Sequence, residues 1–351
     1  MNDDPVKMKN FLGKMLVELG AAAAGSLVLI GDRLGLYRTL AQEGPLTSEA
    51  LASATGTSER YVREWASAQA ASGYINYDTE TKTFSMSPEQ IAVFADPDSP
   101  YNMTGGYYSV SSLWHDEPKL TEAFKSGDGV AWAEHHPCLF CGTEKFFRPA
   151  YTKNLVDEWI PALDGVHDKL RSGAKVADVG CGHGVSTVVM AKAYPNSTFV
   201  GFDYHGPSIE AACANAAQAG AANVKFETVA AKEFPGSDYD LVCYFDCLHD
   251  MGDPVGALRH AHKALKPGGA LFLVEPFAHD TLEENLNPFG RVFYSFSTMV
   301  CTPASLSQEV GLALGAQAGE KRLRAVAEEA GFSSFRRAAQ TAFNLVLEAK
   351  P

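Results

Sequence analysis

From residue 173 onward the chain alternates between short runs of β-branched or aromatic residues and helical stretches. The expected strands are residues 175–179, 198–203, 224–229, 240–245 and 270–274. The expected helices are residues 184–193, 207–219 and 255–265. This alternation predicts a parallel sheet covered by helices on both faces. A further helix at 320–330 precedes two short strands, 335–340 and 343–349, which predict an antiparallel ending to the same sheet.

A glycine-rich loop follows the first of these strands. Asp178 and Val179 lead into Gly180, Gly182 and Gly184, spaced as G-x-G-x-G. Glycine lets the backbone turn sharply and approach a ligand at the carboxyl edge of a parallel sheet, next to a helix N-terminus. The next strand ends at Asp203, where a carboxylate would face a ribose diol. The two features together predict a nucleoside-containing ligand, whereas a glycine turn alone is common in α/β proteins.

With these motifs the chain resembles the class I S-adenosylmethionine-dependent methyltransferases. Residues 178–182 resemble their first motif, residues 239–249 their fourth strand and its loop, and residues 265–269 the turn before the fifth strand. The resemblance covers roughly residues 150–351. It implies an α/β fold, with a Rossmann-like seven-stranded methyltransferase sheet and S-adenosylmethionine as the cofactor, S-adenosylhomocysteine being the product.

The resemblance also implies which residues bind the cofactor. They are Asp178, Gly180, Cys181, Gly182, Asp203, Tyr204, Ala230, Ala231, Asp246 and Cys247. The chain departs from the family at Ala230-Ala231, where many relatives carry an Asp-Ala pair that meets the adenine. Here the backbone amide of Ala231 could still bond a ring nitrogen, but the side-chain contact to the exocyclic amine is absent.

His249 is the candidate catalytic residue. It follows the fourth strand of the expected sheet, within His249-Asp250-Met251, where plant-type O-methyltransferases carry the general base in a His-Asp-Trp sequence. Imidazole titrates near neutral pH, so it could accept a proton from a hydroxyl as the methyl group moves. The alternative is that Leu248-His249 is a structural loop element.

Aromatic residues on both sides of the sheet motifs are candidates for the acceptor pocket. Residues 99–170 are expected to form a helical linker or cap that closes over the cofactor, and residues 276–302 an insertion in the substrate wall. The candidate pocket residues are Phe146, Phe147, Tyr151, Glu275 and Tyr294. Aromatic side chains are more often plain core, so each one must be weighed against a packing role.

Residues 1–98 are predicted to form a mostly helical, winged-helix-like domain. Helices over 47–52 and 58–71 precede a strand–turn–strand pattern at 74–86. Residues 1–100 hold eight Lys and Arg against thirteen Asp and Glu, a net charge of −5, whereas DNA binding needs phosphate-neutralising cations on one face. We therefore expect homodimerisation rather than nucleic-acid binding. The alternatives are a transcriptional regulator that uses the methyltransferase fold as a ligand sensor, and a non-catalytic cofactor-binding protein.

Composition favours a cytoplasmic protein that acts on a small molecule. The net charge of −13 disfavours nucleic acid and anionic membranes. The apolar stretch at 19–31 is too short to span a bilayer. Seven cysteines, several within apolar runs, indicate reduced thiols. His135, Cys138 and Cys141 have the residue types of half a zinc site, but no second Cys-x-x-Cys follows and we expect no metal.

Overall fold

The computed structural model describes residues 4–351, and the chain divides into two compact units. The N-terminal unit comprises Met1–Trp114 and Pro137–Pro149, and the C-terminal unit comprises His115–His136 and Ala150–Pro351. The expected division at residues 98 and 170 differs from this one. Residues 99–170 are shared between the two units: one boundary falls inside α6 (Thr104–Ser126), one just before α7 (Cys138–Asn154) and one inside α7. The expected cap stays a prediction.

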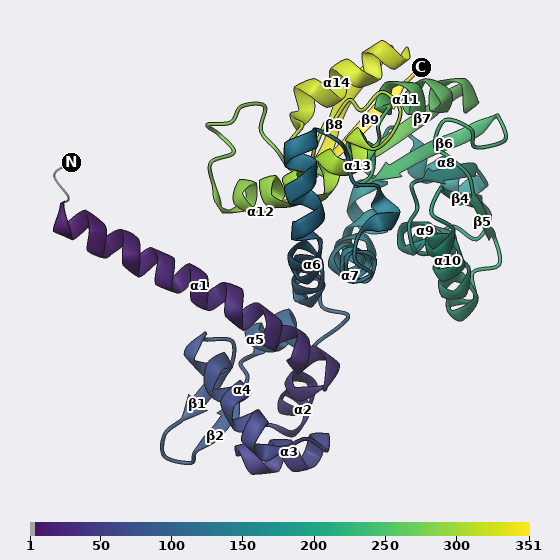
Figure 1. The fold of residues 1–351 in the computed structure, drawn as a ribbon. Helices are drawn as coiled ribbons and strands as arrows, with labels where there is room; N and C mark the ends of the chain where they lie inside the picture. Colours follow the sequence, from purple (N-terminus) through teal and green to yellow (C-terminus); the bar gives the residue numbers. More distant parts are fainter. Residues whose placement is uncertain (1–3) are drawn as a thin grey trace. The chain divides into compact units, whose positions relative to one another are not determined.

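The N-terminal unit is mostly helical, with one β-hairpin (Figure 1). Its elements are α1 (Pro5–Arg33), α2 (Leu36–Glu43), α3 (Ser48–Thr55), α4 (Glu59–Ala71), β1 (Asn76–Asp78), β2 (Thr83–Ser85), α5 (Pro88–Phe94) and the first parts of α6 (Thr104–Ser126) and α7 (Cys138–Asn154). The predicted winged-helix order of two short helices and a hairpin is therefore present.

Local sequence explains the ends of these helices. The Thr47 hydroxyl accepts a hydrogen bond from the Ala50 amide and caps α3, while Ser87 and Gln90 form a reciprocal capping box at α5. The core of the unit is aromatic: the Tyr37 ring meets Trp65 edge-on and stacks on Phe94 at a centroid distance of 5.2 Å. This core ties α2, α4 and α5 together.

Helix α1 is longer than the apolar stretch identified in the sequence. Its 29 residues include an 18-residue window with a mean hydropathy of 1.6, of which 22% is buried, so by length and composition it could cross a membrane. The core helix of a soluble protein or a signal sequence passes the same test. The prediction that no segment is long enough to span a bilayer is therefore not confirmed.

The C-terminal unit contains a seven-stranded sheet in the order β5-β4-β3-β6-β7-β9-β8. Its strands are β3 (Lys175–Val179), β4 (Thr198–Asp203), β5 (Val224–Thr228), β6 (Tyr239–Phe245), β7 (Leu265–Pro276), β8 (Ser334–Gln340) and β9 (Asn344–Lys350). Strands β3 to β7 run parallel, and β9 pairs antiparallel with both β7 and β8. The predicted seven-stranded sheet with an antiparallel ending is confirmed.

Helices α9 and α10 pack together beside β4 and β5, while α11 and α14 pack together on the other side of the sheet (Figure 1). The helical segments of this unit are η1 (Trp132–Glu134), η2 (Leu155–Trp159), α8 (Val166–Ser172), α9 (Val185–Ala193), α10 (Gly206–Ala219), η3 (Leu248–Asp250), α11 (Pro254–Ala264), α12 (Pro288–Phe296), η4 (Ser297–Cys301), α13 (Thr302–Leu306) and α14 (Gly319–Ala330), together with the ends of α6 and α7. Every residue of β6 is buried, as expected for a central parallel strand.

Strand β7 differs most from expectation. It begins at Leu265 rather than near residue 270, because Leu265 already pairs with Tyr239 across an irregularity in the β6–β7 register. The Lys266–Gly269 segment, read as a turn before the strand, lies within this irregular stretch. At the other end, β7 delivers Glu275 to the carboxyl edge of the sheet, where the candidate site lies.

Candidate functional site

The glycine loop after β3 and the carboxylate after β4 are joined directly. The amides of Gly180 and Cys181 both donate to the carbonyl of Phe202, at 2.7 and 3.0 Å. The Gly182 amide donates to Asp203 Oδ2 at 2.9 Å, and the His205 amide donates to Asp203 Oδ1 at 2.8 Å. Burial raises the pKa of Asp203, although these amide bonds oppose the shift. The loop and Asp203 are thus joined at one edge of the sheet, and their contacts with the cofactor stay a prediction.

Two glycines of this loop meet different surroundings. Gly180 has a φ of 73°, and a Cβ there would lie 2.6 Å from Cys247 Sγ. The Cys247 thiol in turn donates to the carbonyl of Val179 at 3.2 Å. At Gly182, by contrast, a Cβ would meet nothing within 4 Å. The loop is therefore packed against Cys247 at its base and open at Gly182.

We expect Gly180→Ala to destabilise the fold by about 1–3 kcal/mol, because alanine at positive φ is strained and its Cβ collides with Cys247. Equilibrium urea unfolding measures the change. The double variant Gly180→Ala, Cys247→Ala removes the collision but not the backbone strain, so it should recover part of the loss. Wild-type stability of Gly180→Ala would contradict the geometry of the loop.

Asp178 points away from the open side of the loop. Its Oδ2 accepts hydrogen bonds from Ser186 Oγ at 2.8 Å and Thr187 Oγ1 at 2.6 Å, at the start of α9. Its Oδ1 is buried without a hydrogen-bond partner. Burial raises the pKa of Asp178 to about 6, although the two hydroxyls oppose the shift. The contacts that are visible thus tie β3 to α9, and the predicted cofactor contact of Asp178 stays a prediction.

Asp246 is the first residue after β6 and has a φ of 50°, which is unusual for a residue other than glycine. Its carboxyl group accepts a hydrogen bond from the Tyr151 hydroxyl at 2.7 Å and one from Asn344 Nδ2 at 2.9 Å. Burial and the Glu275 carboxylate raise the pKa of Asp246 to about 8. The turn at 246 thereby brings α7, β6 and the start of β9 to one point.

This raised pKa predicts a pH dependence of stability. The folded chain holds a proton on Asp246 that the unfolded chain releases near pH 4, so this group lowers the free energy of unfolding as the pH rises from about 4 to about 8. Asp246→Asn, which tolerates positive φ, removes the titration. Urea unfolding from pH 5 to 8 should show the variant gaining stability relative to wild type, by up to about 1.4 kcal/mol per pH unit. A pH-independent difference between the two proteins would refute the assignment.

His249 lies in η3, directly after the 246–247 turn, and is 4% exposed. Its Nδ1 lies 2.5 Å from Glu275 Oε2, and its Nε2 lies 3.2 Å from Asp250 Oδ1. Glu275 Oε1 also accepts the Leu248 amide at 2.9 Å, which fixes the carboxylate. Burial acts to lower the pKa of His249, but the Asp250 and Glu275 carboxylates outweigh it and raise that pKa well above its ordinary value. The neutral imidazole is therefore a stronger base than free imidazole.

The other predicted site residues lie at several places in the C-terminal unit. Ala230 and Ala231 follow β5 and are half-buried, next to a Val229 amide that donates to the carbonyl of Asp203, while Tyr204 follows Asp203 and is exposed. These three lie at the same edge as Asp203. Tyr294 is half-buried on α12, and no hydrogen bond joins its side chain to the residues above. Cys181 is buried at the start of the loop.

Phe146 and Phe147 belong to the N-terminal unit. Their rings meet edge-on at a centroid distance of 5.2 Å, and the Phe146 backbone lies against Gly105 of α6. A role for these two side chains at the cofactor stays a prediction. Tyr151, also on α7, belongs to the C-terminal unit and reaches the site through Asp246.

A cavity of about 390 Å³ lies along the segment that follows β7. Phe277, His279 and Phe289 line it, together with Gln340 and Thr341 from the β8–β9 turn. Part of its wall therefore comes from residues 276–302, the expected insertion. Its volume suits a small molecule.

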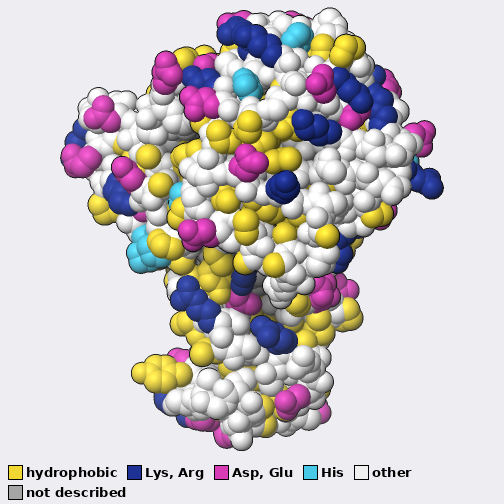
Figure 2. Space-filling view, turned by 90° about the vertical axis from the view of Figure 1, so that its right-hand side faces the viewer, with side chains coloured by type: hydrophobic (Ala, Val, Ile, Leu, Met, Phe, Trp, Pro, Cys, Tyr) yellow, Lys and Arg dark blue, Asp and Glu magenta, His cyan; other side chains and the backbone are white. Residues whose placement is uncertain are grey.

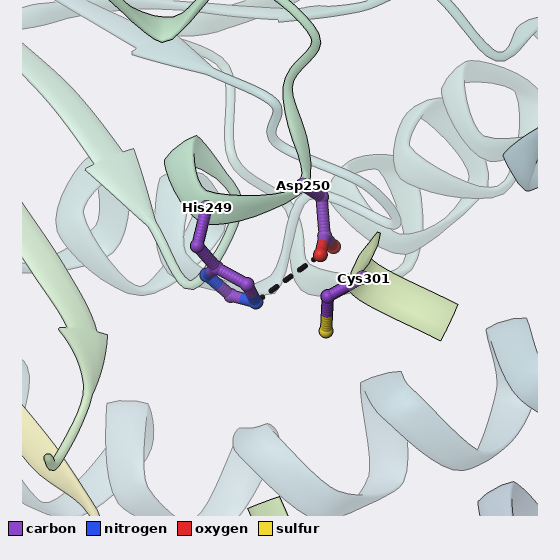
Figure 3. A group of neighbouring side chains, drawn as sticks. All are labelled: His249, Asp250 and Cys301. Atoms are coloured by element: carbon purple, nitrogen blue, oxygen red, sulfur yellow. Dashed lines mark ion pairs between the residues drawn. The ribbon is translucent and has the colours of Figure 1, made fainter. Parts of the chain in front are cut away.

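The His135 and Cys-x-x-Cys segment is divided between the units. His135 Nδ1 lies 3.0 Å from Asp116 Oδ2 in the C-terminal unit, while Cys138 accepts a hydrogen bond from Arg33 at 3.9 Å in the N-terminal unit. Within residues 4–351, the one group of three His, Cys, Asp or Glu side chains with converging ligand atoms is His249, Asp250 and Cys301 (Figure 3).

Sequence reasoning missed three residues of the site. Asn344 supports Asp246 from the antiparallel ending, and Asp250 and Cys301 lie beside His249. Asp250 had a visible signal, since it follows His249 in the sequence. Asn344 and Cys301 had none, because they lie 98 and 52 positions away from the residues they approach.

The described edge fits S-adenosylmethionine. The Asp203 carboxylate is placed to accept from a sugar diol, and the open side of Gly182 leaves room for a ligand against the backbone. Asp203 and Glu275 place carboxylates along one edge, which suits a ligand that carries a sulfonium and an ammonium group. These hydrogen-bond donors and acceptors suit a nucleoside. They do not suit a phosphate group, because a cluster of carboxylates would repel it.

Fold and site together define a class I methyltransferase architecture. Residues 170–331 match the family model described as a methyltransferase domain, and residues 22–95 match the Rv2258c-like winged HTH domain. The chain is therefore a methyltransferase-domain protein that carries an N-terminal winged HTH domain. The predicted class is confirmed at this level, and the methyltransferase-domain match supports S-adenosylmethionine as the cofactor.

Curated relatives match a little over a third of the chain. The ubiquinone biosynthesis O-methyltransferase of Pseudomonas aeruginosa is 32% identical over 135 residues, which is 37% of this chain and 54% of the relative. The protein of the same name from Ralstonia nicotianae is 34% identical over 131 residues, which is 36% of this chain and 51% of the relative. The chain thus spans about half the length of the curated relatives it matches.

Solved structures match over nearly the whole chain. Mitomycin 7-O-methyltransferase MmcR has a TM-score of 0.71 at 18% identity, with 99% of this chain and 100% of that one covered. Human N-acetylserotonin methyltransferase, solved in complex with S-adenosylmethionine, has a TM-score of 0.68 at 16% identity, with 99% and 98% covered. At these identities the likeness establishes the fold.

Proposed function

We propose that this protein transfers the methyl group of S-adenosylmethionine to a hydroxyl group of a small molecule, with His249 as the general base. The observation that carries the proposal is the His249–Glu275 pair at the same sheet edge as the glycine loop and Asp203. A buried imidazole oriented by a carboxylate is the arrangement that proton abstraction needs. The two curated relatives described above are named as O-methyltransferases, which supports oxygen as the acceptor atom.

In this proposal the chain binds and positions the reactants. The cofactor supplies a methyl group already activated by a sulfonium, so catalysis requires alignment and exclusion of water. Asp203 accepts hydrogen bonds from the ribose hydroxyls, and the 180–182 loop lies against the methionine part. Asp246, held by Tyr151 and Asn344, sets the turn between the cofactor edge and His249.

Glu275 determines which nitrogen of His249 acts. With Nδ1–H donated to Glu275 Oε2, Nε2, which lies 3.2 Å from Asp250 Oδ1, is the nitrogen that can accept the hydroxyl proton. Glu275 also stabilises the imidazolium that forms. The 390 Å³ cavity lined by Phe277, His279 and Phe289 supports a small, partly aromatic acceptor.

Two measurements test this function. Calorimetry with S-adenosylmethionine and with S-adenosylhomocysteine should show one site per chain. Incubation with methyl-labelled S-adenosylmethionine and a panel of phenols, catechols and aliphatic alcohols should label at least one hydroxyl compound. Label found only on amines or thiols would contradict the choice of oxygen, and a chain that binds neither nucleoside would contradict the function as a whole.

We further propose that the N-terminal unit makes a homodimer and does not bind nucleic acid. On α4, Arg60 pairs with Glu64 at 2.6 Å and Arg63 with Glu59 at 3.0 Å, so both cations of the would-be recognition helix face acids of the same helix. Figure 2 shows Lys and Arg side chains interspersed with Asp and Glu on the face it draws, rather than gathered into one patch. Such a surface offers little to a phosphate backbone.

Helix α1 supplies an apolar surface for the partner chain. The N-terminal part of α1 extends away from α2–α5 (Figure 1), and it exposes large side chains such as Leu16, 72% exposed, and Val17, 73% exposed. An exposed apolar helix of this size is expected to be covered by another surface. A second copy of α1 is the occupant we propose.

The double variant Leu12→Glu, Leu16→Glu should therefore weaken dimerisation by at least about 30-fold, because the two side chains are four residues apart on one face of α1. Sedimentation velocity over a concentration series measures the shift. Asn10→Glu adds a charge to the same helix without removing an apolar side chain and should leave the dimer intact. A wild-type chain that sediments as a monomer at all concentrations would exclude the dimer.

A further inference from the structure

Three side chains of different chemistry converge beside the sheet edge: His249 and Asp250 from η3, and Cys301 from the last residue of η4 (Figure 3). One ligand atom of each lies within 4.8 Å of the other two. His249 and Cys301 are 4% and 6% exposed, so the group is enclosed. Segment η4 is a π-helical turn between α12 and α13, and such turns occur frequently at functional sites.

The potential metal-ligand atoms of His249, Asp250 and Cys301 lie close to one another. Glu275 holds Nδ1 of His249, so a neutral imidazole presents the Nε2 lone pair to Asp250 and Cys301. Asp250 Oδ1 is buried without a hydrogen-bond partner and lies 3.2 Å from that Nε2. A proton on Nε2 makes this contact an ion pair, and a metal cation in place of that proton would bind the same two atoms.

An imidazole nitrogen, a thiolate and a carboxylate are together the donor set that Zn²⁺ accepts, with three protein ligands and a fourth position left open. A carboxylate on the second nitrogen of a ligating histidine is the usual support of such a site, and Glu275 already provides it. Tetrahedral Zn²⁺ places its ligand atoms roughly 3.3–3.8 Å apart. The Nε2–Oδ1 distance of 3.2 Å is close to this range, and since no separation exceeds 4.8 Å the thiol has to move by about 1 Å at most.

We propose that His249, Asp250 and Cys301 form a binding site for Zn²⁺. Binding replaces the Cys301 thiol proton by a sulfur–zinc bond and the Nε2 proton of His249 by a nitrogen–zinc bond, and both protons are released to solvent. The metal site goes beyond the proposed function. While the site is occupied, methyl transfer is blocked, because Nε2 bonded to a metal ion cannot accept a hydroxyl proton. This exclusion rests on the proposed role of His249, whereas the metal site itself does not.

Metal titration of the full chain, without methyl donor or acceptor, tests the site. Competition with a chromophoric zinc chelator should show one equivalent of Zn²⁺ bound to wild type. Cys301→Ser and Asp250→Asn should each weaken that affinity by about 100-fold or more, and Glu275→Gln by about 10- to 100-fold. Cys213→Ser, a change at the exposed cysteine of α10, is the matched control and should bind like wild type.

Cobalt substitution identifies the ligands directly. Wild type loaded with Co²⁺ should show a thiolate-to-cobalt charge-transfer band that Cys301→Ser loses while Cys213→Ser keeps it. Unchanged Zn²⁺ affinity in both Cys301→Ser and Asp250→Asn, or no stoichiometric binding to wild type, would overturn the proposal. A chain that binds Zn²⁺ as expected but methylates no hydroxyl would contradict only the proposed function, so the two failures are distinguishable.

Discussion

His249→Ala is expected to lower the turnover number by about 10²- to 10⁴-fold, the usual contribution of a general base. The substitution removes the only group that the proposal assigns to proton transfer, while Asp203 and the glycine loop remain in place. Binding of S-adenosylmethionine should therefore stay within about two-fold of wild type. The rate is measured with whichever hydroxyl compound accepts the labelled methyl group, and the affinity by calorimetry.

The matched control is His262→Ala. His262 lies in the last turn of α11 and packs edge-on against Phe332. Its removal should cost some stability but leave the turnover number near wild type. A normal rate in His249→Ala would end the general-base assignment, and a loss of cofactor affinity equal to the loss of rate would show that His249 binds the cofactor instead.

The second large effect is expected at Asp203. Asp203→Ala should weaken S-adenosylmethionine binding by about 10- to 150-fold, since a hydrogen bond to a charged group contributes about 1.5–3 kcal/mol. The variant also frees the amides of Gly182 and His205, which the carboxylate holds at 2.9 and 2.8 Å. Part of the loss would therefore come from a less ordered loop.

Asp203→Asn separates these two causes. The amide oxygen can still accept one backbone amide, so the loop should stay closer to its native form while the charge is lost. Glu210→Gln, which removes an exposed carboxylate on α10, controls for net charge. Calorimetry that shows wild-type affinity in Asp203→Ala would remove this residue from the ribose site.

The sheet was largely predictable because its strands carry a continuous apolar signal. Strands β3 and β4 begin and end at the predicted residues, and the antiparallel pair β8–β9 lies within one residue of its predicted position. Buried parallel strands are apolar along their whole length, so local composition is sufficient to locate them. The start of β7 was missed because its first residues form an irregular pairing that no local pattern encodes.

The helices of segment 99–170 were less predictable for a physical reason. Helices α6 and α7 contain internal prolines, Pro118 and Pro149, and both pass from one compact unit into the other. Each helix therefore changes its buried face along its length, and no single apolar stripe marks it. Tyr151 was identified as a candidate, but its partner Asp246 is 95 residues away.

The order of motifs along the chain was enough to determine the parallel sheet, the glycine loop and the acidic residue at 203. These are properties of short segments, set by residue type and spacing. That Asn344 supports Asp246 and that Cys301 approaches His249 were decided by the tertiary structure alone. Such contacts depend on the pairing of β9 with β7 and on the path of η4. Neither can be predicted from the local sequence around the residues that make the contact.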